Sequence, residues 1–385
     1  MTTSPESAAV GDARPGHRAP GRLTYWRRRA VALLCAAGIA VGLWFAFGDG
    51  TSSATDAAAL STRQLSGERL VAGFSGSTPP PALVDMIKSG ELAGVILFSE
   101  NLGGRRHATH LIHRMQAIKR PSRLRDPILV MVDQEGGEVK RLAGPPQASA
   151  QEMGSRGARY SRRQGAKTAR SLKEVGVNVD LAPVLDVGRR GSAIRSQHRS
   201  FGGTPRRVIR TAVPFAGAME NHGVAATGKH FPGLGAAPQD TDFAVQRIRL
   251  GRSELRRIDE RPYRPFAAAH GSLVMISTAI YPRFSKKPAA FSARIATGEL
   301  RDRVGFDGVS ISDALETVSA RRFGGPARVS RAAARAGTDL LLFTDYHAAA
   351  RGERALRRGL RSGSLNRHPF EQSAQRVLDL RASLG

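Results

Sequence analysis

The sequence predicts an α/β protein built on a (β/α)₈ barrel, also called a TIM barrel. Eight short apolar or β-branched runs recur along the chain: LVAGF (70–74), GVILF (94–98), ILVMV (128–132), VNVDLA (177–182), VAATG (224–228), LVMIS (273–277), GVSIS (308–312) and DLLLF (339–343). Longer segments with helical spacing, such as ARYSRRQGAKTARSLKEVG, separate most of these runs. This alternation indicates parallel strands joined by helical crossovers, and eight such units in roughly 320 residues match the size of the fold.

Polar side chains directly follow most of the predicted strands. They are Ser99 and Glu100, Asp133, Asp186, Lys229 and His230, Asp313, and Thr344 with Asp345. A barrel enzyme gathers its functional side chains at the carboxyl ends of its strands. This set suits a polyhydroxylated ligand and carboxylate acid/base or nucleophilic chemistry. The sequence has no glycine-rich phosphate loop or His/Glu metal cluster among them, so we expect neither a metal nor an organic cofactor.

The composition predicts a strongly cationic surface. The 385 residues include 59 Lys and Arg against 32 Asp and Glu, a formal charge of +27. Such a surface attracts polyanions. The cations are scattered without zinc spacing or an aromatic-rich RNA signature, so no nucleic-acid partner is expected and anionic membranes or cell-wall polymers fit better. An arginine-rich genome is a simpler explanation for part of the charge.

The N-terminal segment predicts a membrane anchor. Residues 30–48, AVALLCAAGIAVGLWFAFG, carry no charge and are about long enough to cross a bilayer as a helix. Three arginines precede them, so residues 1–29 are expected to be a cytoplasmic basic tail and the rest of the chain extracytoplasmic. A cleaved signal peptide followed by secretion is the alternative, since AFG could serve as a cleavage site. Cys35, the only cysteine, lies in this run and forms no disulfide within the chain.

A short polar stretch separates this segment from the barrel. Residues 49–63 are mostly small and polar, which favours a flexible linker. The barrel is then expected to occupy residues 64–385.

Seven motifs between residues 128 and 343 carry a resemblance that covers the chain from about Leu65 to the C-terminus. They are ILVMVDQEGGEVKRL (128–142), VNVDLAPVLDV (177–187), RSFGG (199–203), ATGKHFPGLG (226–235), LVMISTAIYP (273–282), GFDGVSISDAL (305–315) and ARAGTDLLLF (334–343). Together they resemble glycoside hydrolase family 3, most closely its single-barrel bacterial β-N-acetylhexosaminidases. The resemblance implies a barrel enzyme that hydrolyses O-glycosyl bonds.

The resemblance also implies roles for individual residues. Asp313 corresponds to the nucleophile, which would form a covalent glycosyl-enzyme that water hydrolyses with retention. Taken alone, an aspartate at this place is more often a helix N-cap than a catalytic residue. The family's sugar-binding residues correspond to Asp133, Arg141, Arg199, Lys229 and His230. Carboxylates accept hydrogen bonds from sugar hydroxyls, and the cations donate to hydroxyl or acetamido oxygens. For Asp133 and Arg141 the structural alternative is a simple ion pair at the barrel rim.

The loop after the fifth strand departs from the family pattern. The similar glucosaminidases have Asp-Ser-His there, with the histidine as mobile acid/base and the aspartate as its orienting partner. This chain reads Asp-Thr-Asp, which puts Asp240 at the aspartate position and Asp242 at the histidine position. Asp242 could replace the histidine, because two close carboxylates can keep one of them protonated. A solvated Asp-rich turn is the structural alternative, and His222, His270 and His347 have no motif support as substitutes.

The sequence therefore predicts a membrane-anchored, extracytoplasmic retaining glycosidase that cleaves β-linked N-acetylglucosamine in cell-wall glycans. Two weaker outcomes remain open at Asp242: an enzyme with little acid assistance, or a catalytically impaired carbohydrate-binding barrel tethered at the same place.

Overall fold

Eight strands form one parallel sheet in the computed structural model, which describes residues 55–385. They are β1 (Leu70–Ala72), β2 (Gly94–Ile96), β3 (Leu129–Val132), β4 (Val179–Asp180), β5 (Ala225–Phe231), β6 (Leu273–Ile276), β7 (Val309–Ser312) and β8 (Leu341–Phe343). Their order is β7-β6-β5-β4-β3-β2-β1-β8. Each of the eight predicted apolar runs overlaps one strand, so the positions of the strands are confirmed.

The sheet curls into a nearly closed barrel. β7 meets β8 through the bridge between Ile311 and Leu340, where the Ser312 amide donates to the Leu340 carbonyl at 2.9 Å. Side chains of all eight strands fill the interior, and β3, β6 and β7 contribute two each: Val71, Ile96, Leu129, Met131, Val179, Ala225, Leu273, Met275, Val309, Ile311 and Leu342. The predicted (β/α)₈ barrel is thus confirmed.

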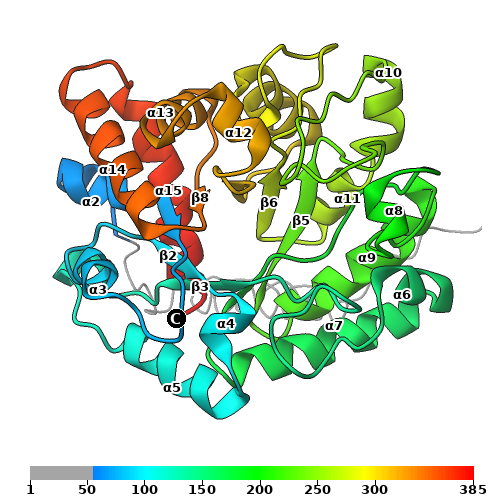
Figure 1. Ribbon diagram of the computed structural model, residues 1–385, viewed down its shortest axis with the longest axis horizontal. Helices are drawn as coiled ribbons and strands as arrows, with labels where there is room; N and C mark the ends of the chain where they lie inside the picture. The colour runs from blue at the N-terminus through cyan, green and yellow to red at the C-terminus, as the bar shows by residue number, and fades with distance from the viewer. Residues whose placement is uncertain (1–54) are drawn as a thin grey trace, which may run out of the picture. The chain divides into compact units, whose positions relative to one another are not determined.

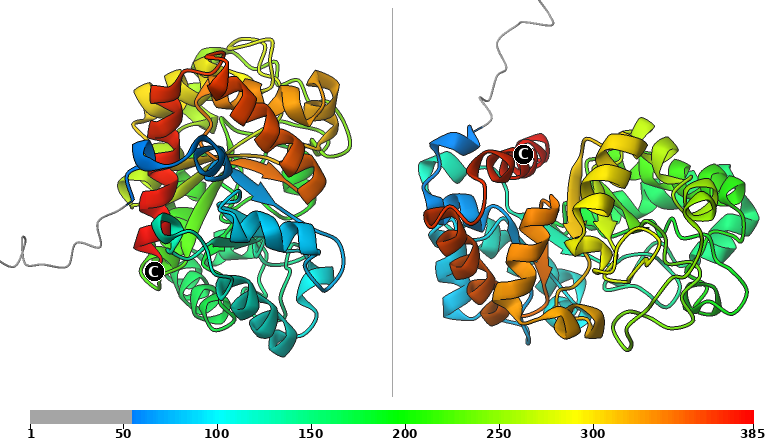
Figure 2. Two further views of the ribbon diagram at one scale, coloured as in Figure 1. Left: turned by 90° about the vertical axis from the view of Figure 1, so that its left-hand side faces the viewer. Right: turned by 90° about the horizontal axis from the view of Figure 1, so that it is seen from above.

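Helices connect the strands and cover the outside of the barrel (Figures 1 and 2). The α-helices are α2 (Thr62–Gly67), α3 (Pro81–Lys88), α4 (Ser99–Leu102), α5 (Arg105–Gln116), α6 (Ala150–Arg156), α7 (Ala158–Lys173), α8 (Ala193–Ser196), α9 (Pro205–Glu220), α10 (Arg252–Glu254), α11 (Tyr263–Ala268), α12 (Val318–Phe323), α13 (Pro326–Ala336), α14 (Tyr346–Arg361) and α15 (Arg367–Ser383). Short 3₁₀ turns are η1 (Ala57–Ala59), η2 (Ser122–Leu124) and η4 (Ala289–Phe291), and two π-helical segments are η3 (Leu255–Asp259) and η5 (Arg294–Val304).

Local capping chemistry sets where several helices begin. Thr204 accepts a hydrogen bond from the Arg207 amide at the start of α9, whose first residue is a proline. Asp345 accepts from the amides of His347 and Ala348 and caps α14. Asp345 is therefore a structural residue, although the sequence grouped it with the polar side chains at strand ends.

β5 is longer than its apolar run suggested. It continues through Lys229 and His230, and the turn begins after Phe231. The sequence predicted that Lys229 and His230 follow the strand, whereas the structure places both inside it, where each side chain has a buried ionic partner. A strand holds both side chains more rigidly than a loop would.

Residues 55–63 fold against the barrel. Ala57 and Leu60 are buried, and the Ala57 amide donates to Gln375 Oε1 of α15 at 2.9 Å. Ser61 caps α2 through a capping box with Gln64. The predicted linker 49–63 was therefore wrong for its last nine residues.

The predicted tail 1–29 and anchor 30–48 lie outside the described residues. Within residues 55–385, no helix has both the length and the apolar character needed to span a membrane.

Candidate active site

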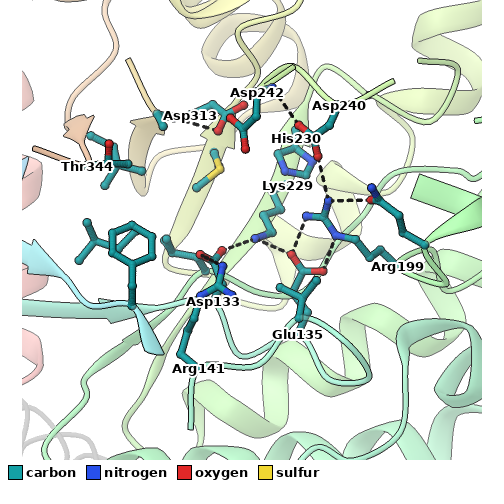
Figure 3. Close-up of a pocket in the computed structure, with 18 of the residues that line it drawn as sticks. Asp133, Glu135, Arg141, Arg199, Lys229, His230, Asp240, Asp242, Asp313 and Thr344 are labelled. Carbon is teal, nitrogen blue, oxygen red and sulfur yellow. Dashed lines mark hydrogen bonds and ion pairs between the residues drawn. The ribbon is translucent and has the colours of Figure 1, made fainter. Parts of the chain in front are cut away.

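A pocket of about 440 Å³ lies at the carboxyl ends of the strands (Figure 3). All eight site residues predicted from the sequence line it: Asp133, Arg141, Arg199, Lys229, His230, Asp240, Asp242 and Asp313. Apolar side chains, among them Phe98, Leu181 and Met275, complete its wall. The pocket therefore combines charged side chains with apolar surface. This combination suits a sugar ring, which has both hydroxyl groups and apolar faces.

Lys229 is a buried cation held by two carboxylates. Its Nζ lies 2.7 Å from Asp133 Oδ1 and 2.7 Å from Glu135 Oε1, and its side chain is only 2% exposed. Burial alone would lower the pKa of Lys229, but the two carboxylates raise it above its usual value. Lys229 therefore stays charged at neutral pH and fixes both acids in place.

Glu135 joins Lys229 to Arg199. Arg199 donates to Glu135 through Nε at 2.8 Å and Nη2 at 2.7 Å, a bidentate pair. Burial opposes ionisation of Glu135, yet Arg199 and Lys229 hold its pKa well below the usual range. Glu135 was not among the site residues predicted from the sequence. Its signal was a second carboxylate two residues after Asp133 in the same motif.

A glycine turn follows Glu135. Gly136 has a φ of +100°, and a Cβ there would lie 2.3 Å from the Ala148 carbonyl oxygen. Only glycine fits this turn, which folds the loop back after β3.

Arg141 lines the pocket and makes only a long contact with Asp133. Its Nη2 lies 3.4 Å from Asp133 Oδ2, a longer contact than that between Lys229 and Asp133. In the described part of the chain, Arg141 Nε is buried without a hydrogen-bond partner. Burial disfavours the ionised form of Asp133, but Lys229 and Arg141 hold its pKa below the usual value. The rim ion pair exists but is secondary, and it leaves Arg141 able to donate to a ligand.

A second buried pair orients His230. His230 Nδ1 lies 2.7 Å from Asp186 Oδ2, and Asp186 also accepts from the amides of His230 and Leu234. Burial would lower the pKa of His230, but Asp186 raises it above the usual value. With Nδ1 bonded to Asp186, Nε2 is the ring nitrogen that can meet a ligand. The sequence placed Asp186 at a strand end without giving it a role.

Asp313 lies directly after β7. Thr241 Oγ1 donates to its Oδ2 at 3.2 Å, and the Ala314 amide donates to its Oδ1 at 2.9 Å. Burial raises the pKa of Asp313, Asp240 adds to this effect, and His230 opposes it by favouring the carboxylate.

Asp313 does not cap the following helix. α12 begins at Val318, and Thr317 is its N-cap, accepting from the Ala320 amide. The structural alternative for Asp313 is therefore wrong, and its carboxylate faces the pocket.

Asp240 and Asp242 approach Asp313 from the loop after β5. Asp240 accepts from Arg199 Nη1 at 3.4 Å and from the Asp242 amide at 3.1 Å. Figure 3 shows Asp242 between Asp313 and Asp240. Although Asp242 is at the open rim, partial burial of its carboxyl, together with the charges of Asp313 and Asp240, raises its pKa to about 6. The Asp-rich turn exists, but it also delivers a protonatable carboxyl to the pocket.

The remaining candidates lie elsewhere. His222, His270 and His347 do not line the pocket. Across residues 55–385, no cluster of three or more His, Cys, Asp or Glu side chains is placed to hold a metal ion. The pocket can bind a hydroxyl-rich ring, supply a carboxylate nucleophile and hold one exchangeable proton.

Comparisons with known proteins agree with this chemistry. Residues 68–380 match the glycosyl hydrolase family 3 N-terminal domain. The chain is 35% identical over 342 residues to an uncharacterized secreted glycosyl hydrolase of Arthroderma benhamiae, covering 86% of this chain and 96% of that protein. It is 34% identical over 262 residues to a beta-hexosaminidase of Thioalkalivibrio sulfidiphilus, covering 66% and 74%.

A solved structure shows the same arrangement of the chain. The glycoside hydrolase family 3 beta-N-acetylglucosaminidase from Paenibacillus sp. str. FPU-7 has a TM-score of 0.80 at 30% identity. The match covers 85% of this chain and 63% of that one, so this chain spans less than two thirds of the longer protein.

Proposed function

The chain belongs to glycosyl hydrolase family 3, and we propose that within this family of glycosidases it is a retaining enzyme that releases β-linked N-acetylglucosamine from cell-wall-derived glycans. The observation that carries the proposal is that Asp313 and Asp242 line the same pocket. The other side of this pocket has the ion-paired side chains that can bind a sugar. The names of the bacterial hexosaminidase relatives support the choice of sugar.

In the first step, Asp313 attacks the anomeric carbon of the sugar. The bond from that carbon to the glycosidic oxygen breaks as an ester forms with the Asp313 carboxylate. The departing oxygen takes the proton of Asp242. In the second step, Asp242 removes a proton from water, the water oxygen bonds to the anomeric carbon, and the Asp313 carboxylate leaves. Two displacements at one carbon give net retention.

The same charges let Asp242 serve as acid and then as base. A pKa of about 6 leaves part of the Asp242 population protonated near neutral pH. Part of this elevation comes from the negative charge of Asp313, which disappears when the ester forms. The pKa of Asp242 must then fall, so that its carboxylate is ready to accept the proton of water.

The ion-paired side of the pocket would hold the sugar. Asp133 offers a carboxylate to ring hydroxyls, while Arg141, Lys229 and Arg199 offer donors. The Arg141 side chain is 27% exposed and contacts Asp133 only at 3.4 Å, so its guanidinium suits a ligand oxygen.

We also propose that residues 30–48 anchor the enzyme in the cytoplasmic membrane with the barrel outside, or are removed when the enzyme is secreted. The uncharged apolar run after three arginines supports this location. The fungal relative is itself named as secreted.

The test is release of p-nitrophenol from its β-N-acetylglucosaminide by the wild type, Asp313→Asn and Asp242→Asn, followed by hydrolysis of the β-linked N-acetylglucosamine disaccharide. Loss of both reactions in Asp313→Asn, and of disaccharide hydrolysis in Asp242→Asn, is the expected result. The product anomer, followed by NMR, should be β.

A second function follows from the replacement of the family histidine by Asp242. If the wild type turns over neither this substrate nor the glucoside while still binding N-acetylglucosamine, the barrel is a carbohydrate-binding module. That outcome would contradict the proposed hydrolase.

A further inference from the structure

Helices α6, α7 and α9 form an outer surface that we call the α7 face. It has many cationic side chains without carboxylate partners in the described chain. Seven Lys or Arg side chains are exposed on α6 and α7, and Arg206, Arg207 and Arg210 are exposed on α9. In the described chain, none of these ten side chains forms an ion pair with a carboxylate. The three helices pack side by side (Figure 1). Their charges therefore form one continuous field rather than separate points.

Part of this face is held in place by an aromatic ring. The guanidinium carbon of Arg156 lies 4.8 Å from the ring centre of Tyr160, and that of Arg163 lies 5.8 Å from it. Arg156 also donates to the Tyr160 hydroxyl at 3.0 Å. Contact with an aromatic ring orients a guanidinium and leaves N–H groups available to an anion.

Two cation-lined hollows flank α7. One, of about 390 Å³, lies between the first turns of α7 and α9 and is lined by Arg206, Arg207 and Arg210. The other, of about 530 Å³, is lined in part by Lys167 and Arg170, and also by Glu174, which pairs with Arg105 at 2.8 Å. At the first hollow, the positive ends of two 16-residue helices add to the arginine charges.

We propose that the α7 face binds a linear, flexible polyanion with repeating phosphate groups, of the polyol phosphate type that is linked to cell-wall glycans. The 16 residues of α7 extend over about 24 Å, long enough for several repeats. A flexible single chain can enter the two hollows and meet the cations between them. The polymer would hold the enzyme on the wall material that carries its substrate.

Two other polyanions fit this face less well. A lipid surface is normally engaged by exposed apolar side chains beside the cations. In residues 55–385 the one exposed large hydrophobic residue is Phe243, on the loop after β5 and not on this face. A nucleic-acid duplex has a persistence length of about 50 nm, so it cannot bend into the hollows as a flexible single chain can.

The experiment compares two variants of the full chain that lose the same charge. The α7 variant carries Arg159→Gln, Arg163→Gln, Lys167→Gln and Arg170→Gln. The matched variant carries Arg351→Gln, Arg354→Gln, Arg358→Gln and Arg361→Gln on α14, where these four arginines are also exposed and have no carboxylate partner within residues 55–385. Binding of fluorescently labelled poly(glycerol phosphate) is measured by anisotropy at several salt concentrations, and circular dichroism establishes that all three proteins are folded.

The α7 variant should bind the polymer about tenfold more weakly or worse, and its log–log salt dependence should be shallower by roughly three, because about four cation–phosphate contacts are lost. The α14 variant should bind nearly as the wild type does. Equal losses in both variants would show that only net charge matters and overturn the proposal, as would absence of wild-type binding.

Two further probes exclude the alternative partners. Tighter α7-dependent binding to phosphatidylglycerol vesicles or to duplex DNA of equal phosphate content would replace the wall polymer with that partner. Because the readout is binding, the result stands apart from glycosidase activity. Hydrolysis of the p-nitrophenyl substrate should be unchanged in both variants, and its absence in all three proteins would count against the proposed function alone.

Discussion

The pocket has two halves that use carboxylates in opposite ways. Around Lys229, the acids Asp133 and Glu135 bond directly to cations, and their pKa values lie below the usual ones. Around Asp313, carboxylates face one another, and the pKa values of Asp242 and Asp313 are raised. We call the group around Lys229 the paired half and the group around Asp313 the crowded half.

The difference separates binding from chemistry. A paired carboxylate keeps one protonation state over the working pH range, so it can only hold a ligand and stabilise the fold. A crowded carboxylate can gain and lose a proton near neutral pH, which general acid–base catalysis requires. Arg199 joins the halves, since it bonds to Glu135 and to Asp240.

The largest effect should come from breaking the paired half. Lys229→Met leaves Asp133 and Glu135 without their shared buried cation, so we expect a loss of roughly 3–5 kcal/mol in the free energy of unfolding, together with loss of activity. Urea denaturation at pH 7 measures it. Asp242→Asn in the crowded half should cost little stability. If the two variants unfold at the same urea concentration, the division into two halves is wrong.

Asp242→Asn should instead damage catalysis. The removal of a general acid costs about 10²–10⁴-fold in rate when the leaving group is poor. We therefore expect this loss in kcat for the N-acetylglucosamine disaccharide, and a much smaller one for the p-nitrophenyl glycoside, whose leaving group needs little protonation. The matched control is Glu138→Gln, an exposed carboxylate that also lines the pocket.

Azide gives an independent sign of the role of Asp242. In Asp242→Gly, added azide should accelerate decay of the glycosyl-enzyme and give the β-glycosyl azide, since the nucleophile Asp313 is intact. Equal losses for both substrates without azide rescue would place the acid elsewhere.

The pH dependence of kcat/KM should show a smaller effect of the crowded half, through the protonation of Asp242. Asp242 must be protonated in the first step, and its pKa is about 6. The kcat/KM for the disaccharide should thus fall as pH rises above about 6, approaching tenfold per unit. In Asp242→Asn the remaining activity should lack this limb. A wild-type limb that survives the substitution would belong to another group.

The free energy of unfolding should also depend on the protonation of Asp242. The pKa of Asp242 is higher in the folded protein than its usual 3.8, so the folded state binds more protons between these values. The contribution of Asp242 to stability is therefore lost as pH rises from about 4 toward 6, and Asp242→Asn should reduce this slope.

The barrel and most of the pocket could be predicted from the sequence because their signals are local. Each strand is a short apolar run, and functional side chains follow the strands directly. Glu135 was missed because its significance depends on Arg199, which lies 64 residues away and reaches it only in the folded barrel. Asp186 gained its role in the same way, through an imidazole 44 residues away.

The linker shows the same limit of local information. Residues 55–63 resemble a flexible tether in composition, yet Ala57 and Leu60 are buried. The partner of the Ala57 amide is Gln375, 318 residues later. Nothing in a nine-residue window indicates whether a distant helix covers it.

The smallest effect we predict concerns the orientation of His230. Asp186→Asn keeps the shape of the side chain but removes the charge that raises the pKa of His230, so this pKa should fall. We expect kcat/KM to fall by about tenfold, because Asp186 orients the His230 ring as the partner of a metal-bound histidine does, and loss of such a partner costs about 10–100-fold. Titration of the His230 ring followed by ¹⁵N NMR provides a readout that a purely structural role would not change.

The chain offers a matched control in Asp180. It is equally buried, and burial raises its pKa to about 8, so that it is largely neutral at pH 7. Asp180→Asn should therefore alter little, since an amide replaces an acid that already carries its proton. If Asp180→Asn shifts the His230 titration as much as Asp186→Asn does, then general burial and not the Asp186 contact sets the charge of His230. His230 would then lie near the crowded half without its charge being set by a specific partner.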